Sequence, residues 1–436
     1  MSAANRPGEH ASLADWLAYL EQLHPKAIAM GLDRVARVQE ALDIRPVFPV
    51  ITVGGTNGKG STCAMLESVL QAAGYSVGLY TSPHLLRYNE RVRIGRVPAT
   101  DAELCRAFAQ VEHARGDIPL TYFEFGTLAA MILFLRTRLD VVILEVGLGG
   151  RLDAVNAFDS DVSIVTSVDM DHMEYLGDTR EAIGFEKAGI FRRGRPAVVG
   201  EPDCPQTVIG HAAEVGARLL LLNRDFGFSG DGAQWRYWGP RGKRGGLPYP
   251  ALRGEHQLFN ASACITALDE LRERMPVTML DVRRGLLEVD IAGRFQVLPG
   301  RPTVILDVAH NPHAALSLAE NLKRMGVCRE TVAVFGMLKD KDIPGVIAAV
   351  KDQITRWLVA DIRERRGATA AQLEEALEAA GGCGDIISFE DAGAAFREAC
   401  RTATANDRIL VFGSFITVAH AMRERSRLDA SARAAR

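Results

Sequence analysis

Residues 51–62, with the sequence ITVGGTNGKGST, carry the clearest chemistry in the chain. Glycines let backbone N–H groups converge on phosphate oxygens, a following helix adds positive potential, and a lysine reaches the terminal phosphates. The segment departs from the usual GxxxxGK[ST] pattern because Gly60 separates Lys59 from Ser61. The strand, the glycines, the lysine and a helix that begins with hydroxyl residues nevertheless all fit a phosphate-binding loop. The segment therefore predicts a nucleotide phosphate site at Thr56, Asn57, Gly58, Lys59, Gly60 and Ser61.

Polar side chains follow two other strand-like runs. Glu145 comes directly after the apolar run Val141–Leu144, and His172 follows the run Val162–Val168. A bound triphosphate needs a nearby carboxylate to hold Mg²⁺, and ligands of α/β sheets gather at the carboxyl ends of the strands. Alternatively, Glu145 is a solvated carboxylate at the end of a strand, and His172 is a surface histidine. Imidazole also suits Mg²⁺ less well than oxygen does.

Lys187 lies among small and apolar neighbours, in the segment AIGFEKAGIF. Two interpretations stay open for it. Most lysines in helices are solvated, whereas a partly buried amine has a lowered pKa and is reactive. Spacing alone does not choose between the two.

The elements that must position these residues alternate between short apolar strands and helices. Strands are predicted at Val50–Val53, Val77–Tyr80, Val141–Leu144 and Val162–Val168, with helices at Thr62–Ala73 and Thr127–Leu135. Strands without polar alternation suit a parallel sheet that is covered on both faces. The fold class is therefore predicted to be α/β.

The alternation of strands and helices begins again at Thr303. Strands are predicted at Thr303–Val308, Thr331–Phe335, Trp357–Ala360, Ile386–Phe389 and Ile409–Phe412, which together indicate a second doubly wound domain. The segment Pro299–Pro302 has the composition of an interdomain linker. We therefore expect domains at residues 1–298 and 299–436.

Composition narrows the class of protein. The chain has 436 residues with 51 Lys and Arg against 54 Asp and Glu, so it lacks the basic surplus of a nucleic-acid binder. The apolar run Leu128–Leu135 is shorter than the roughly 18 residues that cross a bilayer. Seven scattered cysteines without metal-ligand spacing suit a reducing compartment. We expect a cytoplasmic protein that binds neither nucleic acid nor membrane.

Six motifs along the chain carry a resemblance to a known family. They are GTNGKGS at 55–61, TSPHL at 81–85, LEVGLGGRLD at 144–153, EKAGIF at 186–191, GRFQ at 293–296 and DVAHNPH at 307–313. In this combination the chain resembles the Mur ligase superfamily, and within it the bifunctional dihydrofolate synthases/folylpolyglutamate synthases. The resemblance implies an N-terminal P-loop-containing ATPase domain of the Mur ligase type, which binds ATP and the pterin. It also implies a smaller Rossmann-like C-terminal glutamate-ligase domain.

The reaction that the resemblance implies is an ATP-dependent amide ligation. ATP phosphorylates a carboxylate, and the amine of L-glutamate attacks the acyl phosphate to give an amide, ADP and phosphate. The acceptors would be 7,8-dihydropteroate, giving dihydrofolate, and tetrahydrofolate or folyl-glutamates. An enzyme that accepts folates alone is the alternative. Cations at the transferred phosphoryl group would do most of the catalysis. The implied cofactors are ATP and two Mg²⁺, with a monovalent cation as an option.

Individual roles follow from the same resemblance. It implies Mg²⁺ ligands at Ser82, Glu145 and His172 and catalytic roles for Lys187 and His310. Lys187 matches a lysine that family members carry as N6-carboxylysine, a carbamate that turns a cation into an oxygen ligand. His310 lies in the motif that faces the incoming glutamate. Further nucleotide contacts are implied at Asn260, Arg294 and Asp307.

The pterin end of the acceptor is implied at three separate segments. Their residues are Met30, Gly31, Leu32, Asp33, Thr121, Tyr122, Phe123, Leu152, Asp153 and Ala154. Core packing is the alternative for Tyr122 and Phe123. The resemblance thus limits the partners to small molecules, namely dihydropteroate, reduced folates and L-glutamate, and a monomer is expected.

Three rival functions agree less well with the motifs. A ligase of peptidoglycan precursors needs a separate N-terminal domain, and only about 50 residues precede the phosphate-loop strand. A P-loop kinase or GTPase leaves the second domain and the motif at 307–313 without a role. A non-catalytic relative would lack Lys59, Glu145 or Lys187, and all three are present.

Overall fold

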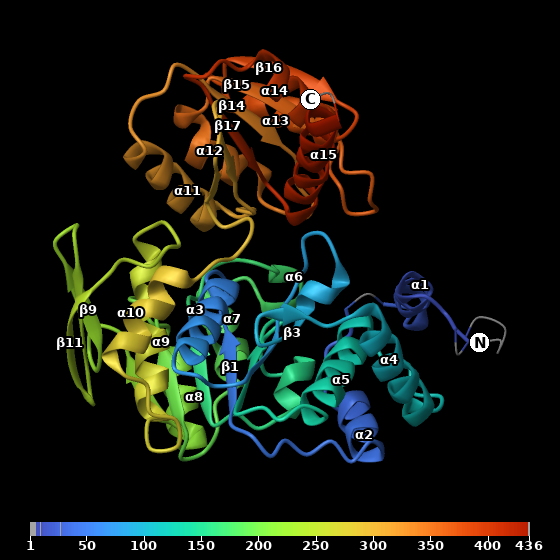
Figure 1. Ribbon diagram of the computed structural model, residues 1–436, viewed down its shortest axis with the longest axis vertical. Coiled ribbons are helices and arrows are strands. Elements are labelled where there is room, and N and C mark those ends of the chain that lie inside the picture. Colours follow the sequence, from blue (N-terminus) through green and yellow to red (C-terminus); the bar gives the residue numbers. More distant parts are fainter. Residues whose placement is uncertain (1–5, 9, 27, 435–436) are drawn as a thin grey trace. The chain divides into compact units, whose positions relative to one another are not determined.

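The computed structural model describes residues 6–8, 10–26 and 28–434, which divide into two compact units. Unit 1 takes the described residues up to Ala251 together with Gln257–Val289. Unit 2 takes Leu252–His256 and the described residues from Asp290 onward. Figure 1 shows the elements of each unit along the colour gradient. The predicted α/β class is confirmed in both units, because each is built around a mainly parallel sheet.

Unit 1 is centred on an eight-stranded sheet in the order β4-β3-β2-β5-β1-β6-β7-β8. The strands β2, β5, β1, β6, β7 and β8 run parallel, whereas β3 and β4 extend the edge in antiparallel pairs. Every residue of β1 and β5 is buried, as the continuous apolar runs predict. The strands are β1 Val50–Gly54, β2 Val77–Tyr80, β3 Val92–Ile94, β4 Val97–Pro98, β5 Val141–Glu145, β6 Val162–Val165, β7 Pro196–Val199 and β8 Arg218–Leu221.

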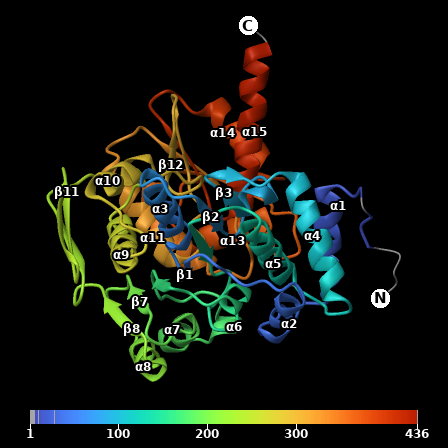
Figure 2. The same cartoon turned by 60° about the horizontal axis from the view of Figure 1, so that its bottom comes forward.

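Helices cover this sheet on both faces. α5 is apolar on all sides and almost wholly buried, which is typical of a helix inside a large core. Figure 2 shows α7 and α8 beside β7 and β8 at one end of the unit. The helices are α1 Leu13–Leu23, α2 Asp33–Ala41, α3 Lys59–Ala72, α4 Asp101–Arg115, α5 Tyr122–Leu135, α6 Met173–Leu176, α7 Arg180–Ala188, α8 Gln206–Val215, α9 His256–Glu270 and α10 Met279–Glu288.

A small antiparallel sheet of three strands follows β8. Its strands are β9 Gly227–Gly230, β10 Trp235–Gly239 and β11 Gly242–Leu247. Trp235 and Tyr237 of the middle strand are buried, and the Tyr237 hydroxyl hydrogen-bonds Thr266 of α9 at 3.0 Å. This polar, glycine-rich stretch is therefore ordered by aromatic side chains that pack toward α9.

Unit 2 holds a six-stranded sheet in the order β12-β13-β17-β14-β15-β16. All of its pairs are parallel except that of β12 with β13. The strands are β12 Gln296–Leu298, β13 Thr303–Leu306, β14 Thr331–Phe335, β15 Arg356–Ala360, β16 Asp385–Phe389 and β17 Arg408–Phe412. The helices are α11 Pro312–Arg324, α12 Ile343–Val350, α13 Ala370–Ala380, α14 Ala392–Thr402 and α15 Phe415–Ala434.

Two expectations from the sequence need correction. The domains at 1–298 and 299–436 remain a prediction, and the compact units of the structure change at Val289 and Asp290. The segment Pro299–Pro302 is the turn between the antiparallel strands β12 and β13, not a linker. In addition, β6 ends at Val165 rather than at Val168, and the residues that follow it contact the phosphate loop.

Within the described part of the chain, no helix combines the length and the apolar character that a membrane crossing demands.

Candidate functional site

The phosphate loop is anchored by the segment that follows β6. The amide of Thr56 donates to the Ser167 carbonyl at 2.8 Å, and the Asn57 amide donates to the Ser167 hydroxyl at 2.9 Å. The Thr166 hydroxyl donates to the Asn57 carbonyl at 2.6 Å. Gly55 allows this contact, because a Cβ there would stand 1.9 Å from the Thr166 hydroxyl oxygen. These contacts hold the loop against the segment that follows β6.

The loop leads into the first turn of α3, where backbone N–H groups lack helical partners. Gly58 precedes that turn at φ 87°, and a Cβ there would lie 2.6 Å from the Asn260 side-chain oxygen. The structure therefore brings Asn260 to the predicted phosphate loop. The Lys59 ammonium donates to the carbonyls of Gly55 and Thr56 at 2.9 and 3.2 Å. N–H groups, a cation and a cradle without side chains are what a triphosphate requires.

Ser82 and Glu145 meet at the carboxyl ends of neighbouring parallel strands. Glu145 ends β5 and is 4% exposed, and the Ser82 amide donates to its carboxylate at 3.1 Å. His172 lies after β6 at φ 52°, with Nε2 3.7 Å from the Asp171 carboxylate. No group of three His, Cys, Asp or Glu side chains among the described residues is placed to hold a metal ion. A Mg²⁺ site here would need substrate oxygens and water, which are ligands that Mg²⁺ commonly keeps.

Lys187 is buried near the end of α7, with 4% of its surface exposed. Burial and, to a smaller extent, the nearby Lys59 ammonium lower its pKa to about 7, although the charge of Asp171 acts in the opposite direction. The backbone of Gly150 packs against the same turn of helix, because a Cβ on Gly150 would stand 2.9 Å from the Lys187 carbonyl oxygen. A buried amine that is neutral near pH 7 is a nucleophile and can form a carbamate with CO₂.

The three predicted pterin segments come together in unit 1. The Gly31 amide donates to the Leu152 carbonyl at 3.4 Å, and the Met30 side chain lies against Gly149. Phe123 packs onto Gly147, where a Cβ would come within 2.8 Å of its ring. Leu32 and Asp33 lie at the start of α2 and Ala154 follows the buried Asp153, while Thr121 caps α5, which begins with Tyr122.

Asp153 is buried beside the phosphate loop. Burial raises the pKa of its carboxyl to about 7, although amides of Leu148 and Val155 donate to it at 2.8 and 3.1 Å. The positive charge of Lys59 acts in the opposite direction to burial. A carboxyl that titrates near neutrality within this cluster is a feature of functional sites.

Two predicted residues of unit 2 lie near one aromatic side chain, and a third, Asp307, holds the backbone beside them. The Arg294 guanidinium lies 5.0 Å from the centre of the Phe415 ring, and the His310 ring lies 6.5 Å from it. The Asp307 carboxylate accepts hydrogen bonds from the amides of Phe295 and Ala309 at 2.8 and 2.7 Å. Asp307 therefore fixes the backbone next to both Arg294 and His310.

Sequence analysis missed several residues that build these sites. Thr166 and Ser167 anchor the phosphate loop, Asp171 faces Lys187, and Phe415 supports Arg294 and His310. The first three follow the same strand as His172, so a search for polar residues at strand ends would have found them. Phe415 has no comparable signal, because a single aromatic residue at the start of a helix has no distinctive pattern.

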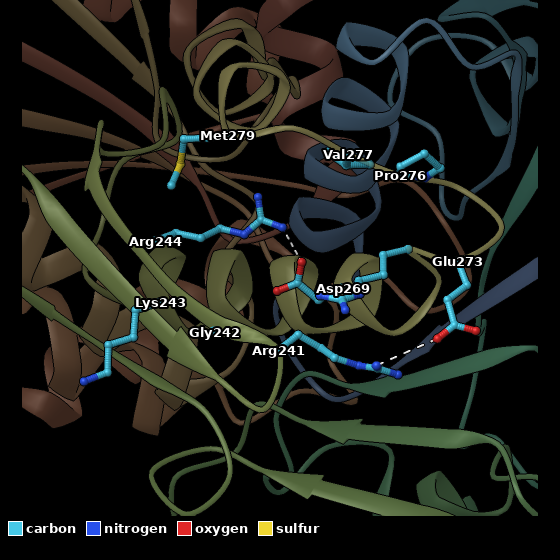
Figure 3. A pocket seen from close by; sticks show the side chains of 10 residues that line it. Arg241, Gly242, Lys243, Arg244, Asp269, Glu273, Pro276, Val277 and Met279 are labelled. Atoms are coloured by element: carbon cyan, nitrogen blue, oxygen red, sulfur yellow. Dashed lines mark hydrogen bonds and ion pairs between the residues drawn. The ribbon is translucent and has the colours of Figure 1, made fainter.

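A separate charged pocket lies between the three-stranded sheet and the C-terminal end of α9. Figure 3 shows Arg244 paired with Asp269 and Arg241 paired with Glu273 in this pocket. Its lining residues are Arg241, Gly242, Lys243, Arg244, Asp269, Arg272, Glu273, Pro276, Val277 and Met279. None of the residues predicted to bind substrate or metal lines it, so it is not the candidate active site.

Comparison with known proteins decides the family. Residues 53–268 match the Mur ligase middle domain, and residues 293–415 match the Mur ligase glutamate ligase domain. The chain belongs to the Mur ligase family. Within that family it is 47% identical to a dihydrofolate synthase/folylpolyglutamate synthase of Escherichia coli, over 95% of this chain and 96% of the relative. A Haemophilus influenzae protein of the same name is 42% identical, over 93% of this chain and 96% of the relative.

Solved structures of such ligases share the fold along nearly the whole chain. An E. coli FolC structure in complex with DHPP and ADP superimposes with a TM-score of 0.92 at 45% identity, covering 97% of this chain and 100% of that one. A bifunctional folylpolyglutamate synthase/dihydrofolate synthase with Mn, AMPPNP and L-glutamate bound gives 0.89 at 47% identity, covering 96% and 99%. The resemblance that the motifs indicated is confirmed. This chain is an ATP-dependent ligase of the Mur type.

Proposed function

We propose that this chain joins L-glutamate to 7,8-dihydropteroate, forming dihydrofolate, and to tetrahydrofolate and its glutamyl derivatives. The observation that supports this most strongly is that the Lys59 charge acts on the buried Lys187 of α7, while Glu145 ends β5 beside Ser82. The same unit holds three segments able to bind a flat aromatic acceptor. The relatives named above carry both activities in their names. ATP is consumed in the reaction and released as ADP and phosphate.

In the first step a carboxylate oxygen of the acceptor attacks the terminal phosphorus of ATP, and ADP leaves. The amides of Gly58–Ser61 and the Lys59 ammonium hold the phosphates in line and balance their charge. Ser82, Glu145, His172 and a carbamylated Lys187 would hold Mg²⁺, which when bound draws charge from the phosphate oxygens. A bare carboxylate is a poor electrophile, and phosphorylation supplies both an electrophilic carbon and a leaving group.

In the second step the amine of L-glutamate attacks the acyl carbon, loses a proton, and displaces phosphate. We assign this amino acid to unit 2, where the His310 ring lies 6.5 Å from the centre of the Phe415 ring. Asn260, which lies beside Gly58, is assigned to the nucleotide. Two Mg²⁺ and a monovalent cation complete the proposed set of ions.

An ADP-release assay tests this function with dihydropteroate and tetrahydrofolate, each with and without L-glutamate. We expect ADP release to depend on both an acceptor and glutamate, with each acceptor supporting turnover. ADP release that ignores glutamate would instead identify a phosphotransferase or nucleotidase. Turnover with tetrahydrofolate but not with dihydropteroate would exclude the dihydrofolate synthase activity and support the folylpolyglutamate synthase activity alone.

A further inference from the structure

Arg91 is a cation whose position is fixed beside the predicted acceptor site. Its carbonyl accepts a hydrogen bond from the Thr81 amide at 2.9 Å, at the carboxyl end of β2. Its guanidinium lies over two ring faces, 5.3 Å from the centre of Tyr88 and 5.4 Å from that of Tyr122. Its Nε also hydrogen-bonds His84 Nδ1 at 2.9 Å. These contacts orient the plane of the guanidinium without neutralising its charge.

Arg91 differs from other arginines nearby because it has no acidic partner among the residues that the structure describes. Arg93 pairs with Glu67 at 2.5 Å, and Arg34 pairs with Glu124 at 2.8 Å. For the described residues, the contacts of the Arg91 side chain are its two aromatic neighbours and His84, and none is a carboxylate. A half-buried guanidinium without a counter-ion favours binding of an anion from outside the chain.

The loop before Arg91 is held rigidly. The Glu90 carboxylate accepts hydrogen bonds from the amides of Leu85, Leu86 and Arg87, each at 2.8 Å. At the start of the same loop, Ser82 donates to Glu145. Arg91 therefore lies between the loop that begins at the predicted metal ligand Ser82 and the predicted acceptor segment at Tyr122. Because that loop is held rigidly, the guanidinium needs little reorganisation to bind a ligand.

The two acceptors of the proposed function differ by one carboxylate. Dihydropteroate has a single carboxyl group, and that group reacts. A folyl-glutamate has a γ-carboxyl that reacts and an α-carboxylate that stays unchanged. We propose that Arg91 binds this α-carboxylate and so determines how well the enzyme uses folyl-glutamates relative to dihydropteroate. The inference rests on the proposed function and adds to it a residue that distinguishes the two substrates.

The test compares Arg91→Gln with the wild type on both acceptors, in the ADP-release assay at saturating ATP and glutamate. Loss of a charged hydrogen bond to the α-carboxylate should raise KM for tetrahydrofolate roughly 10- to 100-fold. KM for dihydropteroate should stay within about twofold. Arg87→Gln is the matched control, because Arg87 is an exposed arginine of the same loop that pairs with Asp101. It should change neither constant.

A substrate analogue tests the same contact from the other side. Tetrahydropteroyl-4-aminobutyrate keeps the reacting carboxyl group and lacks the α-carboxylate. The wild type should prefer tetrahydrofolate over this analogue, and Arg91→Gln should use the two equally well. Arg91→Lys should give an intermediate KM, because it keeps the charge and loses the planar fork. This variant replaces Arg91→Gln if the latter does not fold.

Several results would overturn the inference. They are an equal loss with both acceptors, an unchanged KM for tetrahydrofolate, or a wild-type enzyme that does not distinguish tetrahydrofolate from the analogue. Each of these can occur while the wild type still consumes ATP with both acceptors. Failure of the proposed function would give a different result. The wild type would then release no ADP with either acceptor, or it would release ADP without glutamate.

Discussion

Unit 1 contains two charged regions that differ in whether their cations form ion pairs with carboxylates. In the pocket of Figure 3, Arg244 pairs with Asp269, and Arg241 lies 3.5 Å from Glu270 and 3.9 Å from Glu273. At the phosphate-loop edge, Lys59 donates to backbone carbonyls, and burial next to that cation lowers the pKa of Lys187 to about 7. Neither lysine forms an ion pair within the part of the chain that the structure describes.

The difference separates charges that support the fold from charges that await a ligand. The ion pairs of Arg241 and Arg244 satisfy their charges within the protein, so these two arginines have little need of an outside partner. Cations that are buried or half-buried without a carboxylate cost stability in the free protein. Their presence at one sheet edge is explained if an anionic substrate neutralises them during the reaction. Four predictions test this distinction.

The largest effect should follow from removing the cation of the phosphate loop. Lys59→Ala should lower kcat/KM for ATP roughly 100- to 1,000-fold, because one donor to the transferred phosphoryl group is lost. The measurement is ADP release with tetrahydrofolate and glutamate. Lys243→Ala, a matched loss of charge in the Figure 3 pocket, should leave kcat/KM unchanged. Equal losses in the two variants would refute the distinction between the regions.

Lys187 should be the next most sensitive position. Lys187→Ala should lower turnover roughly 100-fold, because the oxygen ligand that a carbamate supplies is lost. Acetate should restore part of the activity by placing a carboxylate in the vacated space. The rescue is measured as ADP release against acetate concentration, with Lys59→Ala as the control that acetate does not rescue. Near-normal turnover of Lys187→Ala would contradict the assigned role.

Carbamylation of Lys187 should depend on pH in a defined direction. Its pKa is lowered to about 7, so the amine is protonated below that pH and neutral above it. Only the neutral amine reacts with CO₂, and carbamate formation should therefore rise as pH increases through 7. Carbon-13 NMR of the enzyme in labelled bicarbonate would report the carbamate signal, with Lys187→Ala as the control. A carbamate signal that grows as pH falls would contradict the prediction that the neutral Lys187 amine reacts with CO₂.

The smallest effect on activity is expected in the Figure 3 pocket, where stability should change instead. Arg244→Gln leaves Asp269 partly buried without its partner and should destabilise the fold by about 1–3 kcal/mol. The free energy of unfolding from urea titration is the measurement, and kcat/KM should match the wild type. The exposed pair of Arg284 with Glu288 provides the control, since Arg284→Gln should change stability very little. A loss of activity in Arg244→Gln at unchanged stability would assign the pocket a catalytic role.

Much of the fold followed from apolar periodicity and glycine placement. The strands β1, β2 and β5 were predicted to within one residue, since continuous burial on both faces leaves a clear pattern. The turn between β12 and β13 is not evident from the sequence, because Pro299–Pro302 has the same composition whether it links domains or turns a hairpin. Local composition does not reveal which strand pairs with β13.

Individual site residues were predictable where their chemistry is local. Lys59 begins α3 after a glycine-rich loop and Glu145 ends β5 just before another glycine-rich segment, so their positions indicate a role. Arg91 and Phe415 were not predicted, because their importance depends on neighbours distant in sequence, such as Tyr122 for Arg91 and Arg294 for Phe415. The burial of Lys187 was left open by the sequence and required the packing of α7 to decide it.

A structure of the chain with a non-hydrolysable ATP analogue tests the central claim most directly. We predict that the phosphates contact the amides of Gly58–Ser61 and that the terminal phosphoryl group lies beside Lys59, Glu145 and Lys187. Binding in the pocket lined by Arg241 and Arg244, or a terminal phosphoryl group away from those three side chains, would contradict the account.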